Sequence, residues 1–182
     1  ERIKKHLNSE AGISGKAISV INQSVSDEYL TEVKQNADRL VIFSASRFTK
    51  DKSMDVYIKA ANRIKKSYPG RCDFYISGEG ELEKELKDLN AAEGGAVNFV
   101  DSGQGYKLML KKAHIFVFNS LHEGIPIVLL EALFSGCFIL TSAYEGYKDV
   151  FTTYDIPAYE PGNHQDLETL LESVILNYEI ND

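Results

Sequence analysis

The chain has 182 residues, of which 43% are hydrophobic and 26% charged, and this is the composition of a globular domain that can bury a core. Its formal net charge of -7 at pH 7 disfavours binding to nucleic acids or to an anionic membrane surface. No apolar run approaches the ~18 residues of a membrane span, and the sequence begins at Glu1 rather than Met, so we expect a cytoplasmic piece of a longer protein.

Short apolar runs of the kind that form buried strands recur along the chain, with helix-like stretches between them. The runs that predict strands cover residues 17–21, 40–44, 73–77, 97–100, 114–119 and 138–141, with a weaker run at 156–159. Apolar residues at helical spacing predict helices over 53–67, 81–89, 126–134 and 166–178. Alternating strands and helices indicate crossover connections, so we predict an α/β fold with a mostly parallel sheet covered on both faces.

The chain is expected to form a single domain. Residues 1–39 are polar and irregular, and we assign them to a leading segment that holds the first strand and a short helix. Residues 40–182 carry the regular alternation of strands and helices. The two cysteines, Cys72 and Cys137, lie far apart and border apolar runs, which predicts reduced, buried side chains rather than a disulfide or a metal pair.

Two cations follow the predicted strand at 40–44 and precede the next helix. Ligands of a parallel α/β sheet bind beyond the carboxyl ends of its strands, so Arg47 and Lys52 stand where a ligand is expected. The Arg fork binds two phosphate oxygens and Lys supplies a compact charge, so the pair is suited to a diphosphate. Two cations in a solvated loop are the alternative interpretation.

Residues 120–136, with the sequence SLHEGIPIVLLEALFSG, form the segment richest in candidate binding residues. Gly124 lies in a polar loop after a predicted strand, Pro126 stands where a helix would begin, and Gly136 suits the end of that helix. The free N–H groups and the positive dipole end of such a helix favour phosphate binding. Gly124 would let the backbone approach a ligand closely.

Two carboxylates belong to the same segment. Glu131 lies in an otherwise apolar helix, where an ionised carboxylate needs a partner. The diol of a ribose would supply one, and a salt bridge to an Arg or Lys is the alternative. Glu123, in the loop, would be repelled by a diphosphate, so we expect it to face sugar hydroxyls; otherwise it would stabilise the helix dipole.

Glu123 and Glu131, eight positions apart in the setting EGIP…LEA, resemble the signature of the family-4 (group 1) retaining glycosyltransferases. The segment SRF…KS at 46–53 is similar to that family's phosphate-binding Arg and Lys, and ISGEG at 76–80 resembles its third-strand turn. FILTS at 138–142, with Gly146 and Asp149, fills the place of its next strand and loop. The similarity runs from about residue 40 to residue 149, although Ser53 stands where the family usually has Gly.

The resemblance implies that residues 40–182 form a three-layer, Rossmann-like nucleotide-sugar-binding domain, the C-terminal half of a GT-B enzyme. Such an enzyme transfers a hexose from a UDP- or GDP-linked donor to a saccharide or lipid-linked acceptor with retention of configuration. It needs no metal or other cofactor. The N-terminal half would bind the acceptor and make any peripheral contact with the inner face of a membrane, so this chain would neither insert into a membrane nor transfer sugar alone.

The resemblance also implies roles for particular residues. The diphosphate would be held by Arg47, Lys52 and backbone N–H groups of the segment from Gly124 through Ile125 to Pro126 and of the helix turn that follows, although Pro126 itself has no N–H to donate. Sugar hydroxyls would bind Glu123, the ribose would bind Glu131, and the base would lie against the backbone around Gly78 and Val100. His122 would border the donor or cap the helix. The implied catalytic set is Arg47, Lys52 and Glu123, and no metal ligands are implied.

Other functions fit the sequence less well. A dinucleotide-dependent oxidoreductase is disfavoured because the two Gly-x-Gly pairs, at 78–80 and 103–105, do not follow the first strand of the fold. A glycoside hydrolase that uses Glu123 and Glu131 would leave the two cations without a role. A non-catalytic nucleotide-sugar-binding domain and a sugar-nucleotide epimerase of the same architecture stay open as alternatives.

Overall fold

A parallel sheet organises the computed structural model, which describes residues 25–29, 39–123, 126–144 and 156–177. Its strands are β1 (Leu40–Ala45), β2 (Cys72–Ser77), β3 (Val97–Val100), β4 (Ile115–Phe118), β5 (Phe138–Ser142) and β6 (Ala158–Tyr159). In the described part of the chain they follow the order β3-β2-β1-β4-β5-β6, and every neighbouring pair is parallel. The predicted α/β class with a parallel sheet is therefore confirmed.

The central strands pair in parallel along their length and are buried on both faces of the sheet. β1 pairs with β2 from Leu40↔Cys72 to Ala45↔Ser77, and every residue of β4 is buried. A parallel sheet covered by helices requires such near-continuous apolar strands, because neither face meets water. Cys72 and Cys137 are both free and buried, as the sequence predicts, and burial raises the pKa of the Cys72 thiol to about 11.

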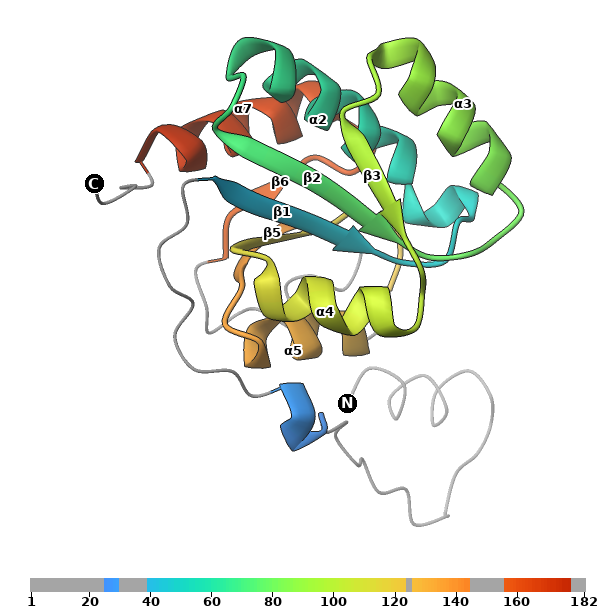
Figure 1. Cartoon of the computed structure of the whole chain (residues 1–182), viewed down its shortest axis with the longest axis vertical. Helices are drawn as coiled ribbons and strands as arrows, with labels where there is room; N and C mark the ends of the chain where they lie inside the picture. The colour runs from blue at the N-terminus through green and yellow to red at the C-terminus, as the bar shows by residue number, and fades with distance from the viewer. Residues whose placement is uncertain (1–24, 30–38, 124–125, 145–155, 178–182) are drawn as a thin grey trace, which may run out of the picture.

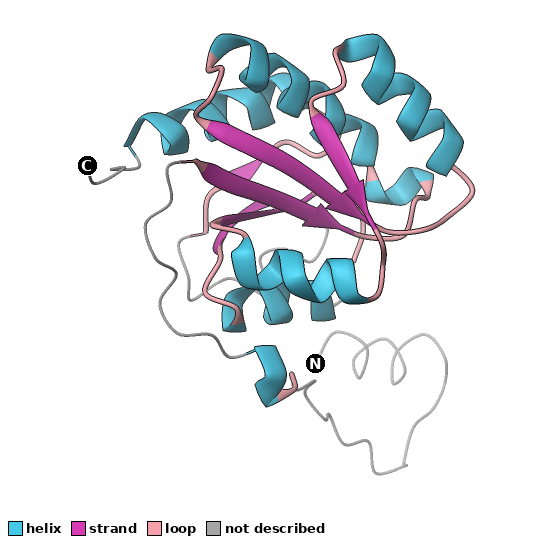
Figure 2. Cartoon of the chain, in the orientation of Figure 1, coloured by secondary structure: helices cyan, strands magenta, loops and turns pink. Residues whose placement is uncertain are grey.

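Helices of the described residues cover both faces of the sheet (Figure 1). One face carries α2 (Met54–Ser67), α3 (Glu83–Glu93) and α7 (His164–Asn177). The other carries α4 (Gln104–Lys112), α5 (Ile127–Phe134) and the short 3-10 helix η1 (Asp27–Tyr29). The helix–sheet–helix layering is plain in Figure 2, and it matches the predicted three-layer architecture.

The sequence predicts four of the described α-helices and misses α4. The apolar side chains of α4 do stand at helical spacing, because Tyr106 precedes the buried Met109 and Leu110 by three and four positions. The stripe is short, however, since α4 spans nine residues and begins within a Gly-Gln-Gly stretch. The predicted strand at 17–21 lies outside the described residues. No helix in the described ranges is long and apolar enough to cross a membrane.

Candidate functional site

A cleft of about 560 Å³ opens beyond the carboxyl ends of the strands. The chain runs outward from β1 to β3 on one side of the sheet and returns to β4 on the other, so the crevice between β1 and β4 is where ligands of such sheets bind. The residues of the cleft that the sequence had singled out are Arg47, Lys52, Gly78, Glu123, Pro126 and Glu131. The fold therefore gathers into one cavity side chains that are far apart in sequence.

One part of the cleft is built around a buried cation, and we call Asp51, Lys52, Ser120 and Glu123 the cation corner. Lys52 ends the 3-10 helix η2 (Lys50–Lys52), and its side chain is only 8% exposed. Its Nζ lies 3.0 Å from Asp51 Oδ2, donates to Ser120 Oγ at 3.2 Å, and forms an ion pair with Glu123 Oε1. A buried ammonium group needs such partners, because it has lost most of its water.

Asp51 is a member of this corner that sequence reasoning missed. The Thr49 hydroxyl donates to its Oδ1 at 2.7 Å, and this bond, with Lys52 close by, lowers the pKa of the Asp51 carboxyl. The backbone N–H of Leu121 donates to the Asp51 carbonyl at 2.8 Å, which ties η2 to the loop after β4. An acidic residue directly before the candidate Lys52 was the available sequence signal.

Buried polar side chains fix the strand ends beneath the cation corner. Asn119 donates to Ser44 Oγ at 2.8 Å and accepts a hydrogen bond from the Tyr159 hydroxyl at 2.5 Å. Ser142 donates to the carbonyl of Ser120 at 2.6 Å. These bonds join β1, β4, β5 and β6 at their carboxyl ends, so the loop that carries Ser120 and Glu123 starts from a rigid edge.

Arg47 differs from Lys52 in being exposed. It lies in the loop after β1 and lines the cleft, and within the described part of the chain its guanidinium forms no ion pair. Arg47 is thus a cation at the cleft whose donors are available to a ligand.

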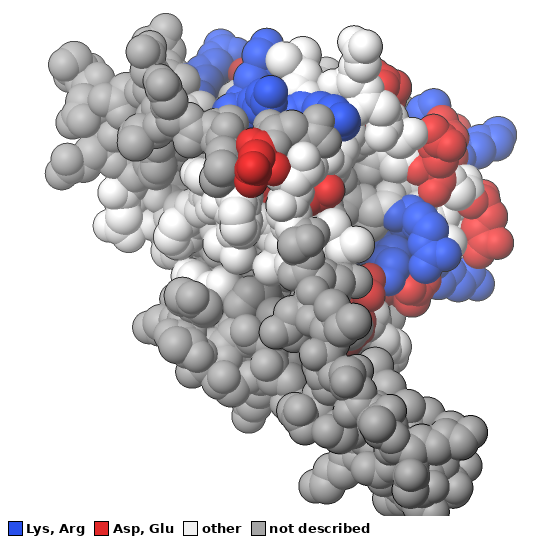
Figure 3. All heavy atoms as spheres, turned by 90° about the horizontal axis from the view of Figure 1, so that it is seen from below, with Lys and Arg blue, Asp and Glu red and all other residues white. Residues whose placement is uncertain are grey.

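On the face seen from below, basic and acidic side chains of the described residues are interspersed rather than segregated (Figure 3).

A second part of the cleft holds a carboxylate that pairs with no cation of the described residues, and we call Tyr106 and Glu131 the phenol corner. The hydroxyl of Tyr106, on α4, donates to Glu131 Oε2, on α5. Burial and this hydrogen bond strongly raise the pKa of Tyr106. In the described structure the partner of Glu131 is a tyrosine, on the helix that was missed, and no Arg or Lys of the described ranges pairs with this carboxylate.

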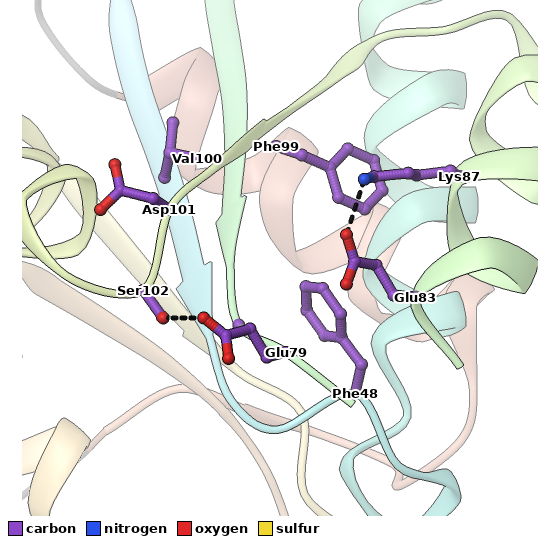
Figure 4. A pocket seen from close by; sticks show the side chains of 9 residues that line it. Phe48, Glu79, Glu83, Lys87, Phe99, Val100, Asp101 and Ser102 are labelled. Carbon is purple, nitrogen blue, oxygen red and sulfur yellow. Dashed lines mark hydrogen bonds and ion pairs between the residues drawn. The ribbon is translucent and has the colours of Figure 1, made fainter. Parts of the chain in front are cut away.

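A second cavity of about 360 Å³ adjoins the cleft and shares Gly78, Glu79 and Ser102 with it. Figure 4 shows the Phe48 and Phe99 rings, 6.2 Å apart between centroids, with the Glu79–Ser102 hydrogen bond beside them. Val100, predicted to border a base, lines this second cavity rather than the main cleft.

Gly78 lies where the two cavities meet. A Cβ atom there would lie 1.8 Å from the Ser46 carbonyl oxygen, so only glycine fits at this position.

The remaining predicted residues are placed less centrally. Pro126 is the N-cap of α5, which agrees with a helix that begins at this point, and Gly136 follows the helix with a φ of 69°. His122 has an exposed side chain and does not line the cleft, so the expectation that it borders a ligand there gains no support. Gly124 and Ile125 lie outside the described residues. Within the described ranges, His, Cys, Asp and Glu side chains form no group of three suited to a metal ion.

Comparisons with known proteins agree on one family. The sequence model of the family described as "Glycosyl transferases group 1" matches residues 25–182. The GalNAc-α-(1→4)-GalNAc-α-(1→3)-diNAcBac-PP-undecaprenol α-1,4-N-acetyl-D-galactosaminyltransferase of Campylobacter jejuni is 32% identical over 126 residues, which cover 69% of this chain and 35% of that protein. The chain spans about a third of the length of such curated relatives.

Solved structures show the same fold. The C-terminal domain of a glycosyl transferase group 1 family protein (LpcC) from Francisella tularensis superposes with a TM-score of 0.73 at 19% identity, covering 86% of this chain and 90% of that one. The HepE protein of Anabaena, solved with UDP and glucose, gives a TM-score of 0.67 at 17% identity, covering 77% of this chain and 40% of that one. The six-stranded arrangement of the described residues is thus that of a Rossmann-like domain of a GT-B glycosyltransferase.

Proposed function

The chain belongs to the glycosyl transferases of group 1, and from this membership we propose that it is the donor-binding half of a retaining hexosyltransferase. The donor in this proposal is a hexose linked to UDP or GDP. The acceptor, a saccharide or a lipid-linked saccharide, would bind a second, N-terminal half that this chain does not match in its longer relatives. Any peripheral contact with a cytoplasmic membrane face would belong to that half as well.

The observation that carries the proposal is the meeting of Arg47 and Lys52 with the start of α5 in one cleft. A diphosphate is a compact dianion or trianion, and each charge-assisted hydrogen bond to it contributes about 1.5–3 kcal/mol. The N-terminus of a helix adds about 0.3–1 kcal/mol for an anion at its first turn. Two cations and a helix start in one concave site favour such an anion over a neutral ligand.

Lys52 reaches a bound diphosphate by exchanging partners. In the free chain its ammonium group is paired with Glu123, so phosphate oxygens compete with that carboxylate. When they replace it, the Glu123 carboxylate becomes free to accept hydrogen bonds from the sugar hydroxyls next to the diphosphate. The ion pair would thereby couple binding of the diphosphate to binding of the sugar.

In the proposed reaction, the bond between the anomeric carbon and the terminal phosphate oxygen breaks, and an acceptor oxygen bonds to that carbon on the same face. The acceptor's proton passes to the leaving diphosphate, so no general base is assigned to this chain. Arg47 and Lys52 stabilise the charge that develops on the leaving group, which is an electrostatic contribution to catalysis. No bound metal is part of the proposal.

Calorimetry on the full chain tests the donor site directly. We expect UDP or GDP to bind in the presence of a metal chelator, and Arg47→Ala to weaken the nucleoside diphosphate about tenfold while leaving the bare nucleoside unchanged. Equal losses for both ligands would show that Arg47 does not bind phosphate. If neither nucleotide binds at millimolar concentration, the proposed function is wrong. We also expect no sugar transfer by this chain alone.

A further inference from the structure

Tyr106 is a cleft residue to which neither the sequence motifs nor the family resemblance gives a role. It lies in the first turns of α4, lines the cleft, and directs its hydroxyl at Glu131 on α5. We propose that Tyr106 is a positioning residue for nucleotide recognition, which holds the Glu131 carboxylate in the orientation that binds the ribose hydroxyls. This inference rests on the proposed function, and in particular on the ribose role of Glu131.

The backbone under Tyr106 is held firmly. Its N–H donates to the Asp101 carbonyl at 2.9 Å, and the Asp101 carboxylate accepts hydrogen bonds from the N–H groups of Gly103 and Gly105 at 3.0 and 3.1 Å. These bonds favour the ionised carboxylate and lower the pKa of Asp101. A Cβ on Gly105 would lie 2.4 Å from Asp101 Oδ2, so a side chain there would require the Asp101 carboxylate to move away from these N–H groups.

The ring of Tyr106 is also supported. It packs against the fully buried Phe43 of β1, with 6.0 Å between ring centroids and an interplanar angle of 49°. Phe43 in turn packs edge-on against Phe116 of β4 at 5.8 Å. The hydroxyl is therefore presented by a rigid side chain that two strands of the sheet support, which is the kind of support that a preorganised site needs.

The chemistry of the pair suits a diol ligand. A carboxylate has two oxygens with about four acceptor positions, so Glu131 can accept from Tyr106 at Oε2 and still accept from one or two ribose hydroxyls. A neutral phenol donates to the carboxylate without cancelling its charge, unlike a Lys or Arg. The ligand therefore does not have to displace Tyr106, and the carboxylate stays in place before the ribose arrives.

Without the phenol, Glu131 would be a long side chain with free rotamers at the cleft wall. Ordering such a side chain on binding reduces affinity by between about two- and tenfold. The loss should be largest for ligands that use Glu131 and small for ligands that lack the hydroxyl it binds. Discrimination between a ribonucleotide and its deoxy counterpart is thus the readout that separates positioning from a general contribution to stability.

The test compares UDP with 2′-deoxy-UDP, and GDP with 2′-deoxy-GDP, by calorimetry on the full chain. Tyr106→Phe removes the hydroxyl and keeps the ring. We expect it to weaken the ribonucleotide by about two- to tenfold, and to weaken the deoxynucleotide, which keeps only one of the two hydroxyls, by less, so that the ratio between them shrinks. A ratio equal to that of the wild type would overturn the proposal.

Tyr68→Phe is the matched control. The Tyr68 hydroxyl also donates to a glutamate, Glu172 of α7, but this pair follows the end of α2 and does not line the cleft. This variant should keep the wild-type ratio, and a shrunken ratio here would mean that loss of any such pair loosens the site.

Glu131→Gln gives a second route that does not depend on the phenylalanine variant. It should lose the same discrimination, and adding Tyr106→Phe to it should have no further effect on the ratio. A further drop in the double variant would show that Tyr106 acts by another path. If no nucleoside diphosphate binds the wild type, the proposed function fails; if one binds and only the ratios disagree, the role of Tyr106 fails alone.

Discussion

The two corners of the cleft satisfy their carboxylates in opposite ways. In the cation corner, Glu123 is paired with the buried ammonium group of Lys52, whereas in the phenol corner Glu131 accepts a hydrogen bond from the neutral Tyr106. An ion pair must be broken or shared when an anionic ligand arrives, but a phenol can stay in place beside a hydroxyl ligand. An anionic ligand would therefore replace Glu123 as the partner of Lys52. A hydroxyl ligand would instead bind Glu131 while Tyr106 keeps its hydrogen bond.

The largest effect should follow from removing the cation. Lys52→Met deletes a phosphate ligand and leaves Asp51 and Glu123 uncompensated beside an incoming anion, so UDP or GDP should bind about tenfold to a hundredfold more weakly. Calorimetry measures this, and circular dichroism checks the fold. Lys84→Met is the control, since Lys84 lies on α3 with a side chain 90% exposed and pairs only with Asp88 among the described residues. Unchanged nucleotide affinity in Lys52→Met would remove the cation corner from the donor site.

Glu123→Gln and Glu131→Gln should change the affinity for a nucleoside diphosphate in opposite directions. The Glu123→Gln substitution frees Lys52 from a charged competitor, so UDP or GDP should bind up to about fivefold more tightly, the value of a partly exposed ion pair of about 1 kcal/mol. The added affinity that the sugar gives to the sugar nucleotide should fall at the same time. Glu131→Gln, in the phenol corner, should weaken the same nucleotides. Weaker nucleoside diphosphate binding in both variants would contradict the exchange of partners by Lys52.

Sequence reasoning found the charges of the cleft but not all of their partners. Arg47, Lys52, Glu123 and Glu131 stand out because residue type, strand ends and a helix start are local signals. The Tyr106–Glu131 bond spans 25 positions and the Lys52–Glu123 bond 71, so each pairing depends on how the helices settle on the sheet.

The missed helix explains why Tyr106 in particular was overlooked. α4 begins within a Gly-Gln-Gly stretch and spans only nine residues, so its apolar stripe is short and the tyrosine had no predicted element to place it. The described strands, in contrast, were predicted to within about two residues, because burial gives the central ones, such as β1 and β4, nearly continuous apolar runs. Longer apolar runs and stripes are thus easier to recognise in the sequence than the short stripe of α4.

The dependence of stability on pH should also differ between the corners. The pKa of Asp51 is lowered by Thr49 and Lys52, so its contribution to stability is present above its ordinary pKa and is lost as the pH falls through the lowered value. The pKa of Tyr106 is raised, so its contribution is present below about pH 10 and is lost as the pH rises further.

Thermal melts from pH 3 to pH 11 measure both effects. Asp51→Asn should flatten the loss of Tm below about pH 4, and Tyr106→Phe should flatten the loss above about pH 10. The alkaline effect will be partial, since burial also raises the pKa values of Tyr57 and Tyr159. If Asp51→Asn changed the Tm only at alkaline pH, or Tyr106→Phe only at acidic pH, these assignments of the two residues would be wrong.

The smallest effect concerns backbone strain next to the cation corner. Ser53, next to Lys52, has a φ of 45° and a ψ of 42° and is the one non-glycine residue of the described ranges with positive φ. That conformation costs about 1–2 kcal/mol for an L-residue, and the added freedom of glycine in the unfolded chain offsets about 0.4–1 kcal/mol of the relief. Ser53→Gly should therefore raise the free energy of unfolding by up to about 1 kcal/mol, or the Tm by about 2–4 °C.

Gly105, the residue before Tyr106, supplies the contrasting variant for this measurement. Gly105→Ala introduces a Cβ that would displace the Asp101 carboxylate from the N–H groups of Gly103 and Gly105, so it should lower the Tm. If Ser53→Gly lowers the Tm as well, the Ser53 hydroxyl, which donates to the Lys50 carbonyl at 3.5 Å, outweighs the strain. If it raises the Tm without changing nucleotide affinity, the strain is a property of the backbone alone. A rise in Tm with tighter nucleotide binding would instead show that the Ser53 side chain restricts access to the cation corner, where Lys52 already has to leave one partner to take another.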